Sequence, residues 1–314
     1  MIEVDSLSKY FGSIQAVRDI SFKIDKGEIV GFLGPNGAGK TTTMRILTCF
    51  FPPTSGKARI AGYDIFKDPL EVRRKIGYFL EKAPLYPDMT VKSFLNFVAE
   101  VRGIGKSDKK QKITKVMGDC GIEQVASRLI GNLSKGYRQR VCLAQSLIHD
   151  PDVLILDEPT IGLDPEHVVE VRELIKDLGS ERTVLLSSHI LPEVSMICQR
   201  VIIIDEGKII AEDTPQNLMD KLQTFSRTFV QIEGPSDSVL KELKKLSGIL
   251  QVEEKGAVSQ KVFSYLVEAK KDVDIGKAIS SAVFKNNWGI LEIRPVTMTL
   301  EEIFLKLVTE EKEV

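Results

Sequence analysis

The stretch EIVGFLGPNGAGKTTTMRILTCF, residues 28–50, decides the fold of the N-terminal part of this chain. It starts as a short apolar run, passes through a glycine-rich loop that ends in Lys40 and Thr41, and continues with apolar residues at helical spacing. The pattern GxxxxGK[ST] between a strand and a helix is typical of a loop that binds phosphate. Glycines let backbone N–H groups converge on phosphate oxygens, and the helix N-terminus adds a favourable dipole. We therefore expect a nucleotide site here rather than a glycine-rich turn without a ligand.

Within this loop, Lys40 is expected to reach the β- and γ-phosphates of a nucleotide, and the Thr41 hydroxyl is expected to bind Mg²⁺. The loop alone is compatible with kinases, GTPases and ATPases. The residues expected to contact the nucleotide phosphates are Gly34, Pro35, Asn36, Gly37, Ala38, Gly39, Lys40, Thr41 and Thr42.

A second stretch, DVLILDE at 152–158, places two acids directly after another buried strand. Asp157 is expected to hold the magnesium ion through its water shell, and Glu158 to orient and polarise an attacking water. Two adjacent acids at a strand end could also form an ordinary exposed turn. Their combination with a phosphate loop favours nucleotide hydrolysis.

The order of apolar runs predicts an α/β domain over residues 1–215. Continuous apolar strands such as 28–34, 152–158, 183–188 and 200–210 are expected where a sheet is buried on both faces. Residues 85–150 show a mainly helical pattern, so we expect a helical subdomain inserted into this α/β core.

The pattern changes after residue 215. We expect a linker at 216–226 and an accessory α+β domain at 227–314, with a final helical segment TLEEIFLKLV at 299–308. The order strand, helix, strand, strand, helix, strand resembles a ferredoxin-like split βαβ domain. Such folds serve many functions, so the fold alone assigns none. Phe263 and Tyr265 lack the basic cluster of an RNA-binding version and are expected to pack in its core.

Composition excludes several classes of protein. The chain has 314 residues, a net charge of −1 and 43% hydrophobic residues, which is ordinary globular composition without a basic field for nucleic acid. No apolar run approaches the roughly 18 residues of a membrane span, and MIEVDSLSKY lacks the features of a secretory signal. The four cysteines are scattered without a CxxC pair and are expected to be reduced.

A third stretch, LSKGYRQR at 133–140, is unusual for a helix start. Ser134 can cap a helix, yet the first turns carry Lys135, Arg138 and Arg140 and no acid. Cations at a helix N-terminus are unfavourable by a few tenths to about 1 kcal/mol each. The pattern is better explained if an anion docks at this helix start.

Together, GPNGAGKTT, LSKGYRQR, LILDEPTIGLDP and SSHI resemble the nucleotide-binding subunit of an ABC transporter, in the motif order of that family. The resemblance covers residues 1–215 and implies an ABC-type ATPase core. IGYFLEKAPLYPDMTV, LSKGYRQR and TMTLEEIFLKL are similar to the subunits that pair with ABC-2-type export permeases in bacteria.

The resemblance implies roles for further residues. Two such domains face each other, and the signature of one caps the ATP held by the phosphate loop of the other. The donors from the signature would be Ser134, Lys135 and Gly136. Asp164 would lie in the loop that contacts the partner, unless it only forms the turn before Pro165.

Three positions would complete the nucleotide site. Phe11 matches the aromatic residue that stacks on adenine, with Tyr10 as the alternative and a strand-end core position as the plain explanation. Val17 would pack beside the adenine. His189 matches the histidine that senses the γ-phosphate and holds the attacking water.

The chain departs from the common family pattern at three positions. Lys135 replaces a glycine and either adds charge toward the phosphate or is solvated. Tyr137 replaces a glutamine and could reach the opposite ribose or simply pack. Glu81 stands where a glutamine normally contacts Mg²⁺, so it is expected to be a metal-shell residue or, in the alternative, an exposed loop acid.

The resulting prediction is an ATPase that forms a homodimer on ATP and Mg²⁺ at the cytoplasmic face of the membrane. It would power a permease that is a separate chain, by the resemblance an exporter, and would bind no nucleic acid. The alternative is an ABC-type ATPase that acts without a permease. A sensor that only binds ATP is disfavoured because Glu158 and His189 are both present.

Overall fold

The computed structural model describes residues 1–81, 84–188, 194–222, 225–270, 273 and 275–296. The chain forms two compact units, Met1–Pro215 and Gln216–Val314. His189 and the segment 299–308, for which a role and a helix were predicted, lie outside the described residues.

The first unit is built on a mostly parallel sheet. Its strands are β3 (Ile29–Leu33), β6 (Ile76–Phe79), β7 (Val153–Asp157), β8 (Thr183–Ser188), β9 (Arg200–Asp205) and β10 (Lys208–Asp213). The strand order is β10-β9-β3-β8-β7-β6, and only the β9–β10 pair is antiparallel. All residues of β3, β7 and β8 are buried, as the continuous apolar runs predict.

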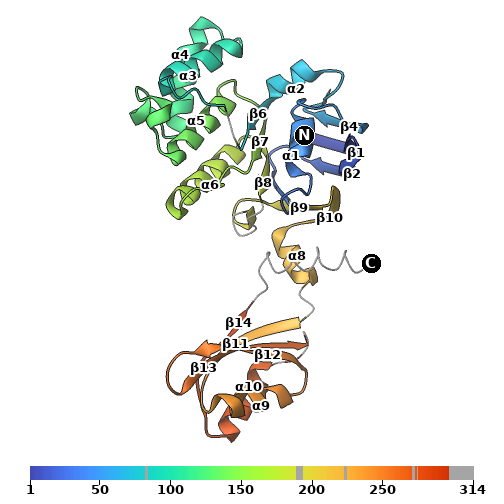
Figure 1. The fold of residues 1–314 in the computed structure, drawn as a ribbon, viewed down its shortest axis with the longest axis vertical. Coiled ribbons are helices and arrows are strands. Elements are labelled where there is room, and N and C mark those ends of the chain that lie inside the picture. The colour runs from blue at the N-terminus through green and yellow to red at the C-terminus, as the bar shows by residue number, and fades with distance from the viewer. Residues whose placement is uncertain (82–83, 189–193, 223–224, 271–272, 274, 297–314) are drawn as a thin grey trace. The chain divides into compact units, whose positions relative to one another are not determined.

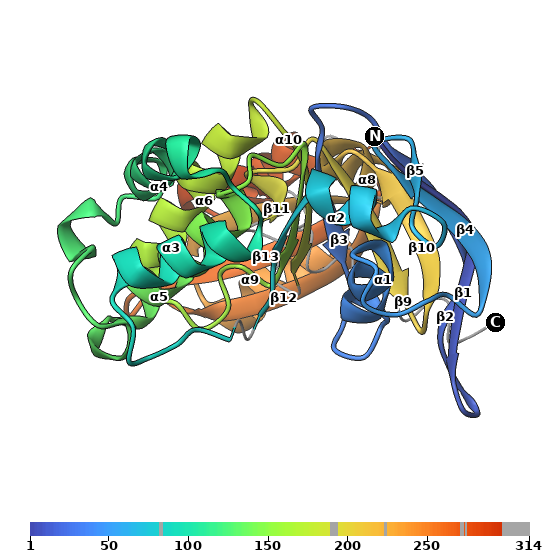
Figure 2. The same ribbon diagram turned by 90° about the horizontal axis from the view of Figure 1, so that it is seen from above.

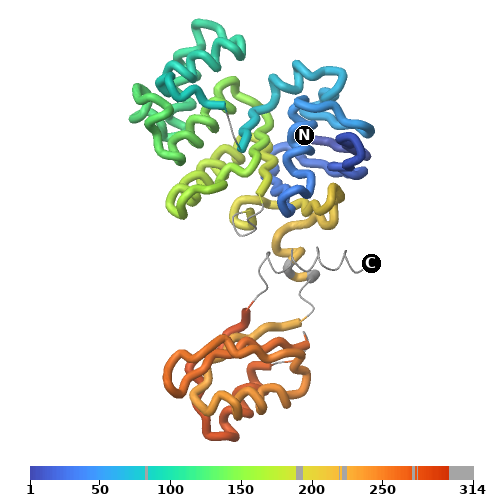
Figure 3. The backbone as a smooth tube through the Cα atoms, viewed as in Figure 1, coloured from blue at the N-terminus to red at the C-terminus, as the bar shows by residue number. Residues whose placement is uncertain are grey.

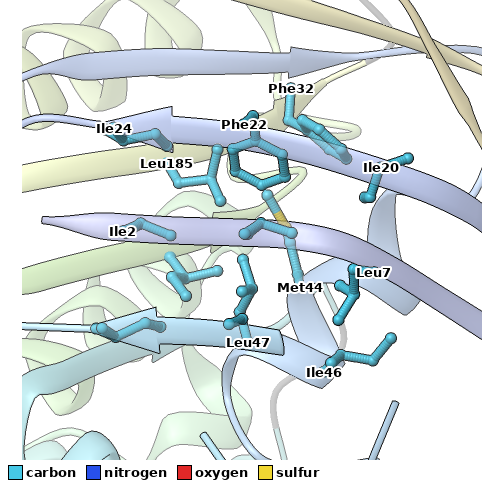
Figure 4. Packing of buried hydrophobic residues seen from close by; sticks show 14 of the residues in the cluster. Ile2, Leu7, Ile20, Phe22, Ile24, Phe32, Met44, Ile46, Leu47 and Leu185 are labelled. Carbon is cyan, nitrogen blue, oxygen red and sulfur yellow. The ribbon is translucent and has the colours of Figure 1, made fainter. Parts of the chain in front are cut away.

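A second, antiparallel sheet lies beside it, which the sequence analysis does not predict. Its strands are β1 (Ile2–Phe11), β2 (Ile14–Ile24), β4 (Ser55–Ile60) and β5 (Tyr63–Asp64), in the order β2-β1-β4-β5. One core joins both sheets to the helix α1 (Lys40–Leu47). Figure 4 shows Met44 and Leu47 of α1 among side chains from both sheets, including Phe22 of β2 and Leu185 of β8.

The helices α3 (Val91–Val101), α4 (Lys106–Asp119) and α5 (Lys135–Leu147) fall within the range expected for the inserted subdomain. They lie at one end of the first unit, and the antiparallel sheet lies at the other, as Figures 1 and 2 show. Thr90 caps α3, because its hydroxyl accepts a hydrogen bond from the Ser93 N–H at 3.2 Å. The remaining helices of this unit are α2 (Pro69–Lys75) and α6 (Pro165–Gly179). The helix α8 (Pro215–Leu222) starts at the boundary between the units.

The second unit has the element order βαββαβ, as its sequence pattern predicts. Its elements are β11 (Phe225–Glu233), α9 (Ser236–Lys245), β12 (Ile249–Ala257), β13 (Val262–Lys270), α10 (Ile275–Lys285) and β14 (Gly289–Val296). The four strands form an antiparallel sheet in the order β12-β13-β11-β14. The two helices cover one face of this sheet (Figures 1 and 3), and Tyr265 is fully buried in the core between them.

No helix in the described part of the chain combines the length and the apolar character that crossing a membrane requires.

Candidate nucleotide site

The loop between β3 and α1 is wrapped tightly around its own lysine. A Cβ atom on Gly34 would lie 2.2 Å from the Ile204 carbonyl oxygen, and Gly39 has a φ of +107° directly before the helix. Only glycine meets both conditions without strain. The Lys40 ammonium donates hydrogen bonds to the carbonyl oxygens of Gly34 at 2.7 Å and Pro35 at 3.1 Å. The helix start therefore holds its cation inside the loop, as a phosphate site requires.

Lys40 also forms an ion pair with Glu158, with 3.6 Å between Nζ and Oε1, and both side chains are less than one-tenth exposed. Burial lowers the pKa of Lys40, and the charge and hydrogen bonding of Glu158 oppose that shift. A further negative charge nearby would stabilise the charged form of this ammonium. The γ-phosphate of ATP is such a charge.

Glu158 itself has a backbone φ of +50°, in the left-handed region that few non-glycine residues adopt. Its N–H donates to Ser187 Oγ at 2.9 Å, and the same hydroxyl donates to Asp157 Oδ1 at 2.7 Å. Ser187 of β8 thus fixes both acids at the end of β7. Backbone strain of this kind is found at functional sites, where surrounding contacts hold it in place.

The residues proposed to hold magnesium lie together. Thr41 Oγ1 donates to Asp157 Oδ1 at 3.2 Å, so the hydroxyl and the carboxylate converge at the phosphate loop. Among the described residues, no cluster of three or more His, Cys, Asp or Glu side chains could hold a metal ion by itself. One or two protein oxygens, water and substrate phosphates are the usual magnesium shell in nucleotide enzymes, and this donor set fits that pattern.

A cavity of about 330 Å³ opens over the phosphate loop. Its lining residues are Ala16, Pro35, Asn36, Gly37, Gly39, Lys40, Thr41, Thr42, Glu81, Glu158 and Ile161. Glu81 therefore faces the same space as Glu158, and its charge is a minor factor opposing the burial that lowers the pKa of Lys40. The Glu81 side chain is nevertheless exposed, so its role in the metal shell stays a prediction.

The position predicted beside the adenine needs a correction. Val17 is fully buried in the core between the sheets, so it offers no surface to a base. Its neighbour Ala16 lines the cavity, because successive side chains of a strand point to opposite faces. The sequence analysis missed Ala16 and Ser187. The alternation of buried and exposed residues over 20–24 would place Ala16 on the buried face, and it is broken at the buried Val17, so the sequence pattern of β2 could not have identified Ala16.

Phe11 and Tyr10 are both about two-fifths exposed at the end of β1. Neither is among the residues that line the cavity over the phosphate loop. The Phe11 ring packs edge-on against Phe51, with 5.6 Å between ring centroids, and Lys9 Nζ lies 5.2 Å from the Phe11 centroid. The choice of Phe11 as the stacking residue therefore stays a prediction.

The signature residues lie elsewhere. Ser134 caps α5, and its hydroxyl accepts from the Tyr137 N–H at 3.4 Å. The Tyr137 hydroxyl accepts from Gln124 Nε2 at 3.0 Å, which is a contact within the helical insert. None of Ser134, Lys135, Gly136 and Asp164 is among the described residues that line the phosphate-loop cavity. The two halves of the predicted ATP site are thus separate within one chain.

A second cavity, of about 430 Å³, is mainly apolar. It lies between β6 and the helices α3 and α5, and its lining includes Leu80 directly before Glu81. Tyr86, Phe97 and Val101 line it and are 41% to 70% exposed. We name this cavity the aromatic groove.

Comparisons with known proteins agree with this geometry. A model of the ABC transporter family matches residues 17–161. The bacitracin transport ATP-binding protein BcrA of Bacillus licheniformis is 35% identical over 313 residues, which cover 98% of this chain and 97% of BcrA.

Solved structures are similar as well. The ATP-binding subunit of an ABC transporter is 28% identical, with a TM-score of 0.64, over 70% of this chain and 92% of that one. The dimeric structure of MJ0796, a bacterial ABC transporter cassette, is 25% identical, with a TM-score of 0.62, over 68% of this chain and 98% of that one.

Proposed function

Because this chain belongs to the family of ABC transporter ATP-binding subunits, we propose that it works as one half of an ATP-dependent dimer that drives a membrane permease. The chain is an ATPase by its family. The dimer, the permease, the direction of transport and the roles of single residues are the parts that we infer.

The separation of the two half-sites supports the dimer. The phosphate loop and Glu158 line one cavity, while Ser134 caps a helix that does not reach it. The start of α5 carries no acid, which suits an anion supplied by a second molecule. The similar cassette MJ0796 was solved as a dimer. We infer that two identical chains each present Ser134, Lys135 and Gly136 to the ATP held by the other.

The mechanism follows from the residues that line the cavity. Lys40 and the backbone of residues 34–39 hold the phosphates, and the partner's signature closes over the γ-phosphate. Glu158 orients a water for attack on the γ-phosphorus, and the bond to ADP breaks on the opposite side. Stabilising the charge of the transferred phosphoryl group is the main task in such reactions. A bound Mg²⁺ supplies further neutralisation, with Thr41 and Asp157 as its protein partners and Glu81 nearby.

Replacing Glu81 by Gln is expected to change the magnesium requirement of hydrolysis. The carboxylate is a better ligand for a hard cation than the amide, and Glu81 faces the cavity beside Lys40 and Glu158. The concentration of Mg²⁺ that gives half-maximal turnover should rise several-fold, roughly three to ten, in E81Q. ATPase rates measured across a magnesium titration test this, with the exposed Glu173→Gln as the matched control. Superimposable curves for E81Q and wild type would remove Glu81 from the metal shell.

The aromatic groove supports the proposal that the chain binds a permease. Half-exposed aromatic side chains around an apolar cavity are typical of a site that receives part of another protein. Leu80 lines the groove, and the next residue, Glu81, lines the nucleotide cavity. A segment bound in the groove at Leu80 would therefore contact the residue next to Glu81. We infer that a cytoplasmic loop of the permease occupies it, which places the chain at the cytoplasmic face of the membrane. We infer export because the segment IGYFLEKAPLYPDMTV resembles subunits that pair with ABC-2-type export permeases.

For the second unit, we infer a ferredoxin-like domain with an accessory role. The antiparallel order β12-β13-β11-β14 with two helices on one face supports this classification. The strand β11 begins at Phe225, so Phe225 and Ser226 belong to this domain and not to the linker predicted at 216–226. We propose that the domain, predicted over 227–314, contributes to contacts within the dimer.

A pull-down tests the proposed function. The tagged E158Q form is expressed in its native cell, and membranes are solubilised with ATP and Mg²⁺. We expect a protein with several membrane spans to co-purify in stoichiometric amounts. Recovery of the subunit dimer alone would favour an ABC-type ATPase that acts without a permease. A second variant tests the aromatic groove. Tyr86→Ser should reduce the yield of the membrane protein without loss of ATP binding.

A further inference from the structure

The signature and the loop at 161–164 are tied together inside one chain. Both are expected to face the partner subunit, and three separate side chains connect the two segments. The contacts involve Lys135, Gln139 and the histidine at position 167, which no motif singles out.

The first contact is made by Lys135. A Cβ atom on Gly162 would lie 2.1 Å from Lys135 Nζ and 3.5 Å from its Cε. The ammonium therefore rests directly on the α-carbon of Gly162, whose φ is +66°. A glycine at position 135, as in the common signature, could make no such contact. The departure from the family pattern thus has a structural consequence within this chain.

The second contact is made by His167 of α6. Its Nδ1 is hydrogen-bonded to Asp164 Oδ1, so the nitrogen donates and the carboxylate accepts. The other side of the ring lies on Gly136 of the signature, where a Cβ atom would be 2.6 Å from His167 Cδ2. Asp164 stands at the N-cap of α6 but makes no capping hydrogen bond with its side chain. Its carboxylate is oriented by the imidazole instead of by the backbone.

The third contact is a longer hydrogen bond, and it also connects the signature helix to the loop at 161–164. Gln139, which is 9% exposed, donates from Nε2 to the Ile161 carbonyl oxygen at 3.5 Å. Residues 135, 136 and 139 on one side therefore meet residues 161, 162 and 164 on the other. The imidazole of His167 is the only one of these groups that touches both a signature residue and Asp164 among the contacts of the described residues.

We propose that His167 is a positioning residue, which holds Asp164 and the signature start in one rigid arrangement so that both meet the partner subunit together. Lys135 supports the same arrangement through its contact with Gly162. The inference rests on the proposed dimer, because only there do these elements act on ATP. His167 touches no phosphate-loop residue among its described contacts, so its effect must appear in turnover and not in the binding of ATP to a single subunit.

The experiment compares His167→Ala with His167→Asn. The alanine form loses both the donor to Asp164 and the ring on Gly136, and kcat should fall about tenfold, since small misplacements of catalytic groups have effects of this order. The asparagine amide can donate from nearly the same place as Nδ1 and should restore kcat to within about threefold of wild type. Glu173→Ala, on an exposed position of the same helix, is the control. Binding of ATP to each form is measured in the absence of turnover.

The outcomes separate the two levels of inference. An E158Q chain with native His167 is first tested for an ATP-dependent dimer. If no dimer forms, the proposed dimeric function and this inference fall together. If it forms and H167A keeps the wild-type kcat, or loses ATP binding as much as turnover, or is not rescued by H167N, only the role of His167 is overturned. A lowered kcat with unchanged ATP affinity and rescue by asparagine supports it.

Discussion

Replacing Glu158 by Gln is expected to leave ATP binding intact and to lower the hydrolysis rate by roughly 10² to 10³. The side chain lines the nucleotide cavity, and its carboxylate forms the ion pair with Lys40. An amide of the same shape keeps the packing at the end of β7 but cannot polarise the attacking water. The ATP that joins the two subunits should then persist, so the dimer should accumulate.

This expectation has two measurements. Steady-state phosphate release gives the rate, and size-exclusion chromatography with ATP and Mg²⁺ gives the dimer. Glu173→Gln removes the same charge from an exposed position and should behave as wild type. The Ser187 hydroxyl offers an independent check, because it orients both acids, and Ser187→Ala should lower turnover by a smaller factor than E158Q. Turnover of E158Q within threefold of wild type would remove Glu158 from its role.

Replacing Lys40 by Met is expected to have a comparably large effect, but on binding. The ammonium is buried, its pKa is lowered mainly by that burial, and the carbonyl oxygens of Gly34 and Pro35 fix its position. Methionine fills a similar volume without the charge, so the phosphates lose their buried cation. Glu158 also loses its ion-pair partner at 3.6 Å and stays buried, which further disfavours an anionic ligand.

We expect the affinity for ATP to fall at least about tenfold and kcat/KM about a hundredfold or more in this variant. Titration with a fluorescent ATP analogue measures the affinity, and phosphate release measures kcat/KM. The exposed Lys26→Met is the control for loss of a surface lysine. If K40M binds ATP as wild type does, the loop does not hold its ligand in the way proposed here.

Much of the nucleotide site could be predicted from the sequence, because its parts are local. The glycines and Lys40 lie within seven residues, so their spacing along the chain almost fixes their spacing in space. The placement of Glu81 in the same cavity follows from the family resemblance and agrees with the cavity lining. Val17, which was predicted beside the adenine, is buried in the core, whereas its neighbour Ala16 lines the cavity. The sequence analysis did not settle which face of β2 looks toward the phosphate loop.

The sequence by itself thus determined the α/β class of the first unit, the element order of the second, and the glycine-rich loop that encloses Lys40. These properties depend on apolar periodicity and on short-range backbone geometry. Only the tertiary structure decided that Ser187 joins Asp157 to Glu158, that an antiparallel sheet shares the core, and that His167 rests on Gly136. Those contacts join residues about 30 or more positions apart, and which strands and helices become neighbours is set by packing of the whole unit, which no local pattern encodes.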